Sequence, residues 1–313
     1  MVISAKQPPI YAIVGPTASG KTVLGVELAL RIRGEVVNCD SVQIYKEIQI
    51  ATAKPTTEEM RGVPHHLVGY IGADIKYTAA DWARDASEKI VEIEKRSARP
   101  VLVGGSGFYL RTLREPLFES PKTDEAIRHK LQQTRTEKGA GHMHNILRRV
   151  DPLAAKRLFP NDFVRVSRAL EVFFQTGTRF SDHQPNRSEP PEFGERIKLI
   201  VLNPQRSAVY SKINLRTKRH FELGLVEEVK RLRESGLSDD TNALGSHGYR
   251  RVCEYLRGDR TLESALEQTQ QDVRNYAKRQ LTWFRKEPGA IWLTGFGEDV
   301  AVQDQLWRII SNE

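Results

Sequence analysis

Short apolar runs alternate with amphipathic stretches in the first third of the chain. Residues 10–14, 35–40 and 100–104 are apolar runs of strand length. Residues 77–95 place an apolar side chain every three to four positions, with charges between them, which indicates an amphipathic helix. Strands that alternate with helices in this way predict a parallel sheet flanked by helices.

The middle of the chain has a different composition. Residues 115–196 are polar, rich in Arg and Lys and helical in pattern, with a Pro-rich loop over 181–194. The apolar run at 197–202 indicates a strand that returns to the sheet. In the last third the pattern predicts helices over 210–234, 247–258 and 261–286 and a short strand over 290–294. We therefore predict an α/β fold with a core over 1–114, a helical insertion domain over 115–196, and a segment over 197–313 that completes the core and adds basic C-terminal helices.

The first strand leads directly into G-P-T-A-S-G-K-T, and helical spacing resumes after Thr22. This string matches the phosphate loop, or P-loop, in its expected context of strand, loop and helix. Glycine lets phosphate oxygens approach backbone N–H groups, Lys21 supplies a positive charge, and the helix N-terminus favours an anion. The Thr22 hydroxyl is a natural ligand for a Mg²⁺ that bridges phosphate oxygens. We expect a phosphate or diphosphate to bind at Gly15, Pro16, Thr17, Ala18, Ser19, Gly20, Lys21 and Thr22.

The motif does not identify the phosphate compound, because kinases, nucleotide hydrolases and transferases that release diphosphate all use such a loop. A P-loop ATPase usually carries an acid at the end of a neighbouring strand, where it holds Mg²⁺. Here the strand at 100–104 ends in Gly104, Gly105 and Ser106 instead. The missing acid counts against ordinary phosphoryl transfer.

Asp40 ends the second apolar run and is followed by Ser41. The C-terminal end of a strand beside a phosphate loop lies in the crevice where open parallel sheets bind ligands. Asp40 is therefore either a helix cap paired with Ser41 or a catalytic or metal-binding acid, and its position favours the second interpretation. His65 and His66 are adjacent in a strand-like segment, so they point to opposite faces and cannot chelate one ion together. We interpret these histidines as structural.

Composition narrows the class of partner and the compartment. The 313-residue chain has a formal net charge of +8 and a pI near 9.4, which favours a polyanion without separating nucleic acid from a diphosphate. Cys39 and Cys253 are the only cysteines and lie far apart, which excludes a disulfide framework and a Cys-rich zinc site. No run approaches the roughly 18 apolar residues of a membrane span, and the N-terminus lacks an apolar signal region. We expect a cytoplasmic protein with no membrane association.

The helix expected over 261–286 has two distinct faces. The inner stripe is formed by Val273, Ala277, Gln280 or Leu281, and Phe284, and a basic stripe lies opposite. A basic stripe is either a solvated face or a surface that contacts a phosphate backbone, and both interpretations remain open. The stripe comprises Arg274, Lys278, Arg279, Arg285 and Lys286, with Arg250 and Arg251 in the preceding helix and with Tyr276 and Trp283 interleaved.

Over nearly its whole length the chain resembles one family, the tRNA dimethylallyltransferases, which move an isoprenoid group onto the exocyclic amine of an adenosine beside the anticodon. D-S-V-Q-I-Y (40–45) and A-K-R-Q-L-T-W-F-R (277–285) are far more specific to this family than the P-loop. The resemblance also rests on T-A-K-P-T (52–56), G-V-P-H-H-L (62–67), Y-T-A-A-D-W (77–82), L-V-G-G-S-G-F-Y (102–109), D-P-L-A-A-K-R-L-F-P-N-D (151–162), R-A-L-E-V (168–172) and G-Y-R-R (248–251). The chain departs from the family pattern at Gln49, Ala51, Ser106 and His247, where Asp, Gly, Thr and Ile are common.

The resemblance implies a donor, dimethylallyl diphosphate, whose diphosphate leaves while held by the P-loop. Lys21 and a Mg²⁺ on Thr22 would neutralise the charge that develops as the diphosphate departs. The adenine amine is a poor nucleophile and needs a positioned base, for which Asp40 is the candidate. By the same resemblance, Ser106 and Arg216 contact the diphosphate near its bridging oxygen, and Ser106 keeps the hydroxyl of the family's Thr.

The implied acceptor is the anticodon stem–loop of tRNA, from which the adenosine is flipped out of its stack into the crevice. Gln43 would lie near the flipped stretch, with an amide able to read a base edge, and Ser41 stands close to it in the same motif. We expect a monomer. The other expected contacts to tRNA are Arg165, Arg168, Arg250, Arg274, Lys278, Arg279, Trp283 and Arg285.

Three other functions remain open at this stage. A P-loop kinase predicts ATP turnover, which the missing acid disfavours. Prenylation of free AMP or ADP shares the first half of the signature, but the long insertion and the basic C-terminal helices favour tRNA. A non-catalytic RNA-binding protein with a relict P-loop would tolerate the loss of Asp40 or Lys21, yet both are present.

Overall fold

In the part of the chain that the structure describes, six parallel strands form one sheet in the order β3-β2-β4-β1-β5-β6. The central strand β1 is buried along its whole length, as expected for a parallel sheet covered on both faces. The register pairs Val14 with both Gly104 and Val201, and Cys39 with Gly104, so the carboxyl ends of four strands meet at one edge. The predicted α/β class is confirmed. The strands are β1 (Ile10–Val14), β2 (Gly34–Cys39), β3 (His65–His66), β4 (Arg99–Gly104), β5 (Ile197–Leu202) and β6 (Ile291–Leu293).

The computed structural model describes residues 7–118, 121–183 and 189–311. The chain divides into two compact units, one formed by residues 1–114 with 191–313 and the other by residues 115–190. The second unit ends at Pro190, before the boundary expected at residue 196. The reason is that Phe193 is buried in the core of the first unit, and Arg196 pairs with Glu94 there at 2.8 Å.

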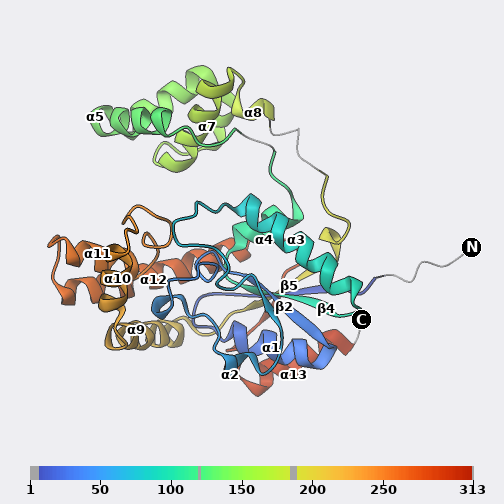
Figure 1. The fold of residues 1–313 in the computed structure, drawn as a ribbon. Helices are drawn as coiled ribbons and strands as arrows, with labels where there is room; N and C mark the ends of the chain where they lie inside the picture. The colour runs from blue at the N-terminus through green and yellow to red at the C-terminus, as the bar shows by residue number, and fades with distance from the viewer. Residues whose placement is uncertain (1–6, 119–120, 184–188, 312–313) are drawn as a thin grey trace, which may run out of the picture. The chain divides into compact units, whose positions relative to one another are not determined.

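Helices cover both faces of the sheet (Figure 1). On one face, α1 (Lys21–Ile32) and α13 (Val300–Ser311) bury apolar side chains, including Leu24 and Leu306, against the strands. On the other face, α3 (Ala79–Lys95) and α4 (Gly107–Arg114) do the same. The hydrophobic pattern predicted α1 and α3 but not α4 and α13.

Trp82 of α3 fixes the end of β2. Its side chain is fully buried, its Nε1 donates to the Asn38 carbonyl oxygen at 2.9 Å, and its ring stacks on Tyr109 with centroids 4.9 Å apart. Thr78 caps the helix and forms a capping box with Asp81, which sets where α3 begins. Removing a buried Trp costs about 3–5 kcal/mol, so this contact stabilises the strand that leads to the predicted site.

The remaining helices of the first unit lie in its C-terminal third and in the segment after β2. The helix expected over 210–234 is two helices, because Gly224 adopts a φ of +93° and breaks it. The capping box of Thr56 with Glu59 starts a short helix after the T-A-K-P-T segment. These elements are α2 (Thr57–Met60), α9 (Arg206–Glu222), α10 (Leu225–Glu234), α11 (Tyr249–Leu256), α12 (Leu262–Phe284) and the 3₁₀ helices Ile50–Thr52 and Gly194–Arg196.

The second unit is helical and has its own small core of apolar side chains such as Leu131, Leu147 and Leu170. Two buried acids organise it. Asp151 caps α6 and accepts from the Ser181 N–H and hydroxyl, both at 2.8 Å, while Glu171 accepts from the Asp124 N–H at 3.0 Å. The helices are α5 (Glu125–Val150), α6 (Pro152–Arg157), α7 (Phe163–Thr176) and α8 (Phe180–His183), with a kink in α5 at Gly139.

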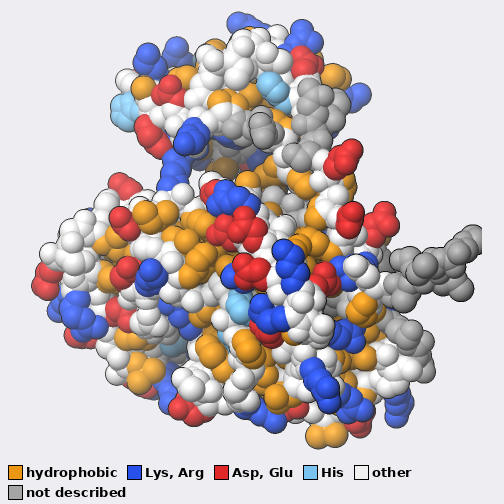
Figure 2. All heavy atoms as spheres, turned by 45° about the vertical axis from the view of Figure 1, so that its right-hand side comes forward, with side chains coloured by type: hydrophobic (Ala, Val, Ile, Leu, Met, Phe, Trp, Pro, Cys, Tyr) orange, Lys and Arg blue, Asp and Glu red, His pale blue; other side chains and the backbone are white. Residues whose placement is uncertain are grey.

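Charged side chains of both signs share the surface. On the face drawn in Figure 2, Lys and Arg lie interspersed with Asp and Glu. Both cysteines, Cys39 and Cys253, are buried thiols, and burial raises the pKa of each. Among the described residues, no helix combines the length and the apolar character that crossing a bilayer requires.

Candidate active site

The glycine-rich loop after β1, residues Gly15–Thr22, packs closely against other parts of the chain. Gly20 has a φ of +83°, which strains any L side chain. A Cβ at Gly15 would lie 2.8 Å from the Leu202 carbonyl oxygen, and one at Gly20 would lie 2.1 Å from Glu298 Oε2. From the sequence alone, we explained these glycines by the close approach of phosphate oxygens to the backbone. In the structure the end of β5 and the turn after β6 already require them.

Lys21 is the first residue of α1, and its ammonium turns back into the loop. Its Nζ donates to the Pro16 carbonyl oxygen at 2.7 Å. Burial lowers the pKa of Lys21 to about 8, the negative charge of Asp40 opposes that shift, and the positive charge of Arg216 adds to it. Lys21 is therefore a desolvated cation close to one carboxylate and one guanidinium, which is a suitable place for an anionic ligand.

Asp40 follows β2 directly and begins a tight turn. Its Oδ1 accepts from the Val42 N–H at 2.9 Å and from the Gln43 N–H at 3.4 Å. The structure therefore shows the capping geometry that was one of the two interpretations of this residue, with Val42 and Gln43 as partners rather than Ser41. The same carboxyl group lines the cavities described below, so the cap also holds the side chain at the site.

The turn after β4 explains why no acid stands at its end. Gly104 is paired with Cys39, and a Cβ at Gly104 would lie 2.0 Å from the Cys39 carbonyl oxygen. Any other residue there would force β2 and β4 apart. Ser106, two residues later, accepts from the Ser41 N–H through its Oγ at 3.0 Å, so the turn after β4 is joined to the turn that carries Asp40.

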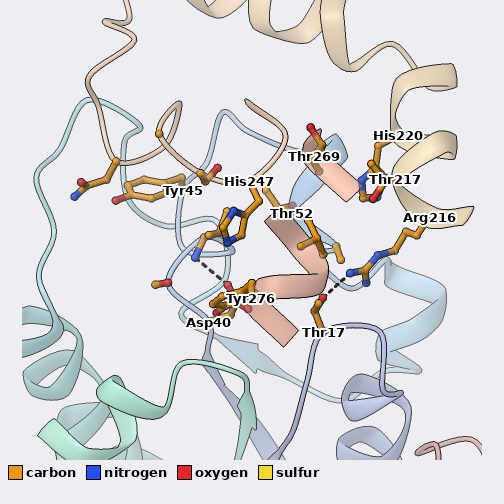
Figure 3. Close-up of a pocket in the computed structure, with 18 of the residues that line it drawn as sticks. Thr17, Asp40, Tyr45, Thr52, Arg216, Thr217, His220, His247, Thr269 and Tyr276 are labelled. Carbon is orange, nitrogen blue, oxygen red and sulfur yellow. Dashed lines mark hydrogen bonds between the residues drawn. The ribbon is translucent and has the colours of Figure 1, made fainter. Parts of the chain in front are cut away.

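Arg216 and His220 lie one turn apart on α9 and face the same cavity (Figure 3). The Arg216 guanidinium donates through Nη2 to the Thr17 hydroxyl of the glycine-rich loop. Burial lowers the pKa of Arg216, and the charge of Asp40 opposes this. Burial first, and the Arg216 charge second, lower the pKa of His220 to about 4, so this imidazole is neutral at physiological pH. We did not predict His220, although its position four residues after Arg216 places it on the same helix face.

Two cavities adjoin at this point. One, of about 470 Å³, includes the glycine-rich loop, and the other, of about 460 Å³, includes aromatic side chains such as Tyr45, Tyr109 and Tyr276. All residues that line them belong to the first unit. The site is therefore a passage with a cationic loop at one end and an aromatic chamber at the other. The residues common to both cavities are Thr17, Asp40, Thr52, Ala53, Arg216 and His220.

The loop that carries two departures from the family pattern is held through its main chain. The N–H of Gln49 donates to Glu228 Oε1 at 3.0 Å, and the N–H of Ala51 donates to the Tyr249 hydroxyl at 3.2 Å. That hydroxyl donates in turn to Glu228 at 2.5 Å. Because backbone amides make these contacts, Gln and Ala preserve the anchorage of the loop. Another departure, His247, packs its ring against Tyr276 with centroids 4.9 Å apart.

The side chains expected to contact tRNA occupy different surroundings within the first unit. Lys278 and Arg279 are exposed on α12, Arg285 is exposed at its C-cap, and Arg250 is exposed on α11. Arg274 donates to Asn214 Oδ1 at 2.5 Å. The remaining three already make contacts within the protein. Ser41 and Gln43 hydrogen-bond to neighbouring turns beside the site. The ring of Trp283 packs against Gly107, with the Arg111 guanidinium over its face.

In the second unit, Arg165 and Arg168 make ion pairs on their own helix α7. Arg165 pairs with Asp162 at 2.8 Å and is exposed. Arg168 pairs with the buried Glu171 at 3.2 Å and donates to the Pro121 carbonyl oxygen at 2.7 Å. Arg168 therefore helps to hold this unit together.

The residues around the glycine-rich loop fit a magnesium ion only if other ligands complete its shell. The described residues contain no group of three or more His, Cys, Asp or Glu side chains placed to hold a metal. Thr22 and Asp40 both line the loop cavity and offer one hydroxyl and one carboxylate. Mg²⁺ keeps several waters and takes oxygens from bound phosphates, so this small donor set suits it.

The fold and the site define an α/β protein with a glycine-rich loop of the phosphate-binding type at the carboxyl edge of its sheet. The family model described as IPP transferase matches residues 43–287. The tRNA dimethylallyltransferase of Geobacter sulfurreducens is 47% identical over 284 residues, which are 91% of each chain. That of Koribacter versatilis is 43% identical over 303 residues, 97% of this chain and 98% of the relative. The chain belongs to the IPP transferase family, and the predicted resemblance is confirmed.

Solved structures agree with this assignment. The tRNA isopentenylpyrophosphate transferase of Bacillus halodurans aligns with a TM-score of 0.70 and 36% identity, over 98% of this chain and 95% of that one. A eukaryotic dimethylallyltransferase acting on tRNA aligns with a TM-score of 0.76 and 27% identity, over 98% of this chain and 79% of that one. Both alignments include the glycine-rich loop region, which precedes the segment that the family model matches, because they omit only 2% of this chain.

Proposed function

We propose that this protein transfers a dimethylallyl group from dimethylallyl diphosphate to the exocyclic N6 amine of the adenosine 3′ to the anticodon in tRNA, and releases diphosphate. The observation that carries this proposal is the passage itself. It joins a cationic glycine-rich loop to an aromatic chamber, and Asp40, Thr17 and Arg216 line both parts. An anionic leaving group suits one end and a planar base suits the other.

The donor diphosphate would bind at residues 15–22, with Lys21 and Arg216 as its cationic partners. One backbone amide of the loop is not available to it, because the Thr17 N–H already donates to Gln280 Oε1 at 2.8 Å. Mg²⁺ on the Thr22 hydroxyl would supply positive charge to the departing diphosphate. Ser106 would reach the diphosphate through its hydroxyl, whose oxygen also accepts from the Ser41 N–H.

The transfer is a substitution that needs one base to take up the proton that the amine loses. The N6 atom of adenine attacks C1 of the dimethylallyl group, the bond from C1 to the diphosphate oxygen breaks, and its electron pair leaves with the diphosphate. Asp40 accepts the proton that N6 loses. The backbone amides of Val42 and Gln43 hold Oδ1, so the carboxylate has one orientation before the substrates arrive.

The acceptor adenosine would enter the aromatic chamber after flipping out of the anticodon loop. Tyr45, Tyr109 and Tyr276 offer rings for the flipped base, and the neutral His220 adds no charge beside it. We propose that the enzyme acts as a monomer in the cytoplasm. The side chains proposed to contact tRNA are Ser41, Gln43, Arg165, Arg168, Arg250, Arg274, Lys278, Arg279, Trp283 and Arg285.

The test is transfer of label from radioactive dimethylallyl diphosphate to an unmodified anticodon stem–loop with consecutive adenosines after the anticodon. We expect label on the adenosine next to the anticodon, and a loss in kcat of about 10²–10⁴-fold in Asp40→Asn with little change in the donor KM. Asp74→Asn, an exposed carboxyl outside the passage, is the matched control.

Two results would contradict the proposal. Native transfer by Asp40→Asn would remove Asp40 as the base. Hydrolysis of ATP by the wild-type protein, without any movement of label, would instead favour a kinase or ATPase.

A further inference from the structure

The side chain of Gln280 on α12 spans two loops of the active site. It is 5% exposed. Its Oε1 accepts from the Thr17 N–H at 2.8 Å, and its Nε2 donates to the Gly105 carbonyl oxygen at 3.0 Å. One buried amide thus joins the glycine-rich loop after β1 to the turn after β4.

The chemistry of the two contacts requires an amide of this length. A backbone N–H only donates and a backbone carbonyl only accepts, so the side chain between them must offer one acceptor and one donor. A carboxylate lacks the donor, and a thioether lacks the donor and is only a weak acceptor. The fit is tight, because a Cβ at Gly105 would lie 2.0 Å from Nε2 of Gln280.

Each end of this bridge continues to a group that the proposed reaction uses. Thr17, at one end, also accepts from Arg216 through its hydroxyl. Gly105, at the other end, precedes Ser106, whose Oγ accepts from the N–H of Ser41 next to Asp40. The bridge therefore lies between the side of the site that holds the diphosphate and the side that holds the base.

We propose that Gln280 is a positioning residue, which fixes the spacing between the glycine-rich loop and the turn that carries Ser106. This inference rests on the proposed function, because the spacing matters only if a diphosphate at the loop and an amine beside Asp40 must meet. The Gln280 side chain lines the loop cavity, but both polar atoms of its amide are engaged by the main chain, so its proposed action is through Thr17 and Gly105. It keeps the leaving group in line with the incoming nitrogen, and a displacement of about 1 Å in such an arrangement costs about 10²-fold in rate.

Gln280→Met and Gln280→Glu separate a positioning role from a merely structural one. Gln280→Met keeps the volume and loses both hydrogen bonds, and we expect kcat to fall about 100-fold while the donor KM changes much less. Gln280→Glu keeps the acceptor for Thr17 and loses the donor for Gly105. Burial raises the pKa of a carboxyl group, so a protonated Glu restores that donor at lower pH.

The rate of Gln280→Glu relative to wild type should therefore rise as the pH falls from about 8.5 to about 6, whereas that of Gln280→Met should not. Gln132→Glu and Gln132→Met, at an exposed position of α5, are the matched controls and should follow wild type throughout. Thermal unfolding identifies any variant that is partly unfolded. The recovery of Gln280→Glu at low pH keeps the test decisive even if Gln280→Met does not fold.

The outcomes are distinguishable. Transfer by Gln280→Met at the wild-type rate, or a Gln280→Glu profile parallel to wild type, overturns this inference and leaves the proposed function intact. A wild-type protein that moves no label overturns the proposed function, and the inference with it.

Discussion

Two turns of the active site contain several glycines, and they need glycine for different reasons. In the loop after β1, Gly20 adopts a left-handed conformation. In the turn after β4, Gly104, Gly105 and Gly107 are not among the residues with positive φ, but a Cβ on each would lie between 2.0 and 2.1 Å from a neighbour. The first turn needs glycine partly for its backbone shape, and the second needs it only for space. A glycine-rich string in a sequence therefore does not by itself mark the approach of a ligand.

The tight packing of the turn after β4 also explains why the site has no Mg²⁺-binding acid of the ATPase type at that position. The acid of a P-loop ATPase would stand near the end of β4, and the carbonyl of Cys39 fills the space of any side chain at Gly104. Close packing of β2 against β4 thus excludes a metal-binding carboxylate at that position. Two acids line the loop cavity, and one of them, Glu59, is engaged in the capping box with Thr56. For the other, Asp40, we propose a different task, which is proton removal.

The largest effect is expected from Gly104→Ala. The added Cβ meets backbone atoms of Cys39, which cannot rotate away, so β2 and β4 must separate. We expect a loss of about 3 kcal/mol or more in the free energy of unfolding. Urea unfolding measures it. A loss below about 1 kcal/mol would mean that the turn adapts easily, and the distinction between the two turns would fail.

A smaller effect, confined to binding, is expected from Lys21→Met. Removing the cation of the glycine-rich loop should raise the donor KM about 100-fold, because breaking an ion pair with a desolvated partner costs about 2–5 kcal/mol. We expect the fold to stay intact. The wild-type enzyme should also bind inorganic diphosphate more weakly as the pH rises past about 8, where Lys21 loses its proton. Titration calorimetry at several pH values checks both, and affinity that is independent of pH would contradict the assignment.

The smallest effect is expected from Gly141→Ala in α5, which serves as the reference for both turns. Its backbone is not in the left-handed region, and no atom lies within 4 Å of an added Cβ. Gly141 lies in the first turn after the kink at Gly139. Alanine is more favourable than glycine by about 0.5–1 kcal/mol in a helix interior and by less in a first turn, so the second unit should become slightly more stable. Destabilisation of the second unit in urea or thermal unfolding would contradict this reading.

Local pattern was enough for much of the fold. The apolar runs at 10–14, 100–104 and 197–202 become β1, β4 and β5 because each is short, apolar and bounded by residues that end strands. Gly224 divided a helix that looked continuous, since helical spacing persists across it. The helix α4 was missed because it begins within a glycine-rich string that reads as a turn.

The site was less accessible from local pattern, because its members are brought together from distant parts of the chain. Arg216 was expected there only through a family resemblance, and the structure shows it donating to Thr17, which lies 199 residues earlier. Gln280 appeared as one residue of an inner helical stripe, and nothing in its neighbours announces that its amide reaches the glycine-rich loop. Trp283 was expected to contact tRNA, and no local pattern indicates that its ring packs against Gly107, a residue of another helix. The roles assigned to these residues in the reaction stay predictions.

The backbone N–H groups of Gln49 and Ala51 hydrogen-bond to the side chains of Glu228 and Tyr249, which are themselves hydrogen-bonded to each other. These hydrogen bonds come from the backbone, so they do not depend on the side chains at positions 49 and 51. Ala51 lines the aromatic cavity. A substitution at position 51 should therefore change the shape of the cavity that receives the base without moving the backbone. This position is suited to engineering new acceptor preferences.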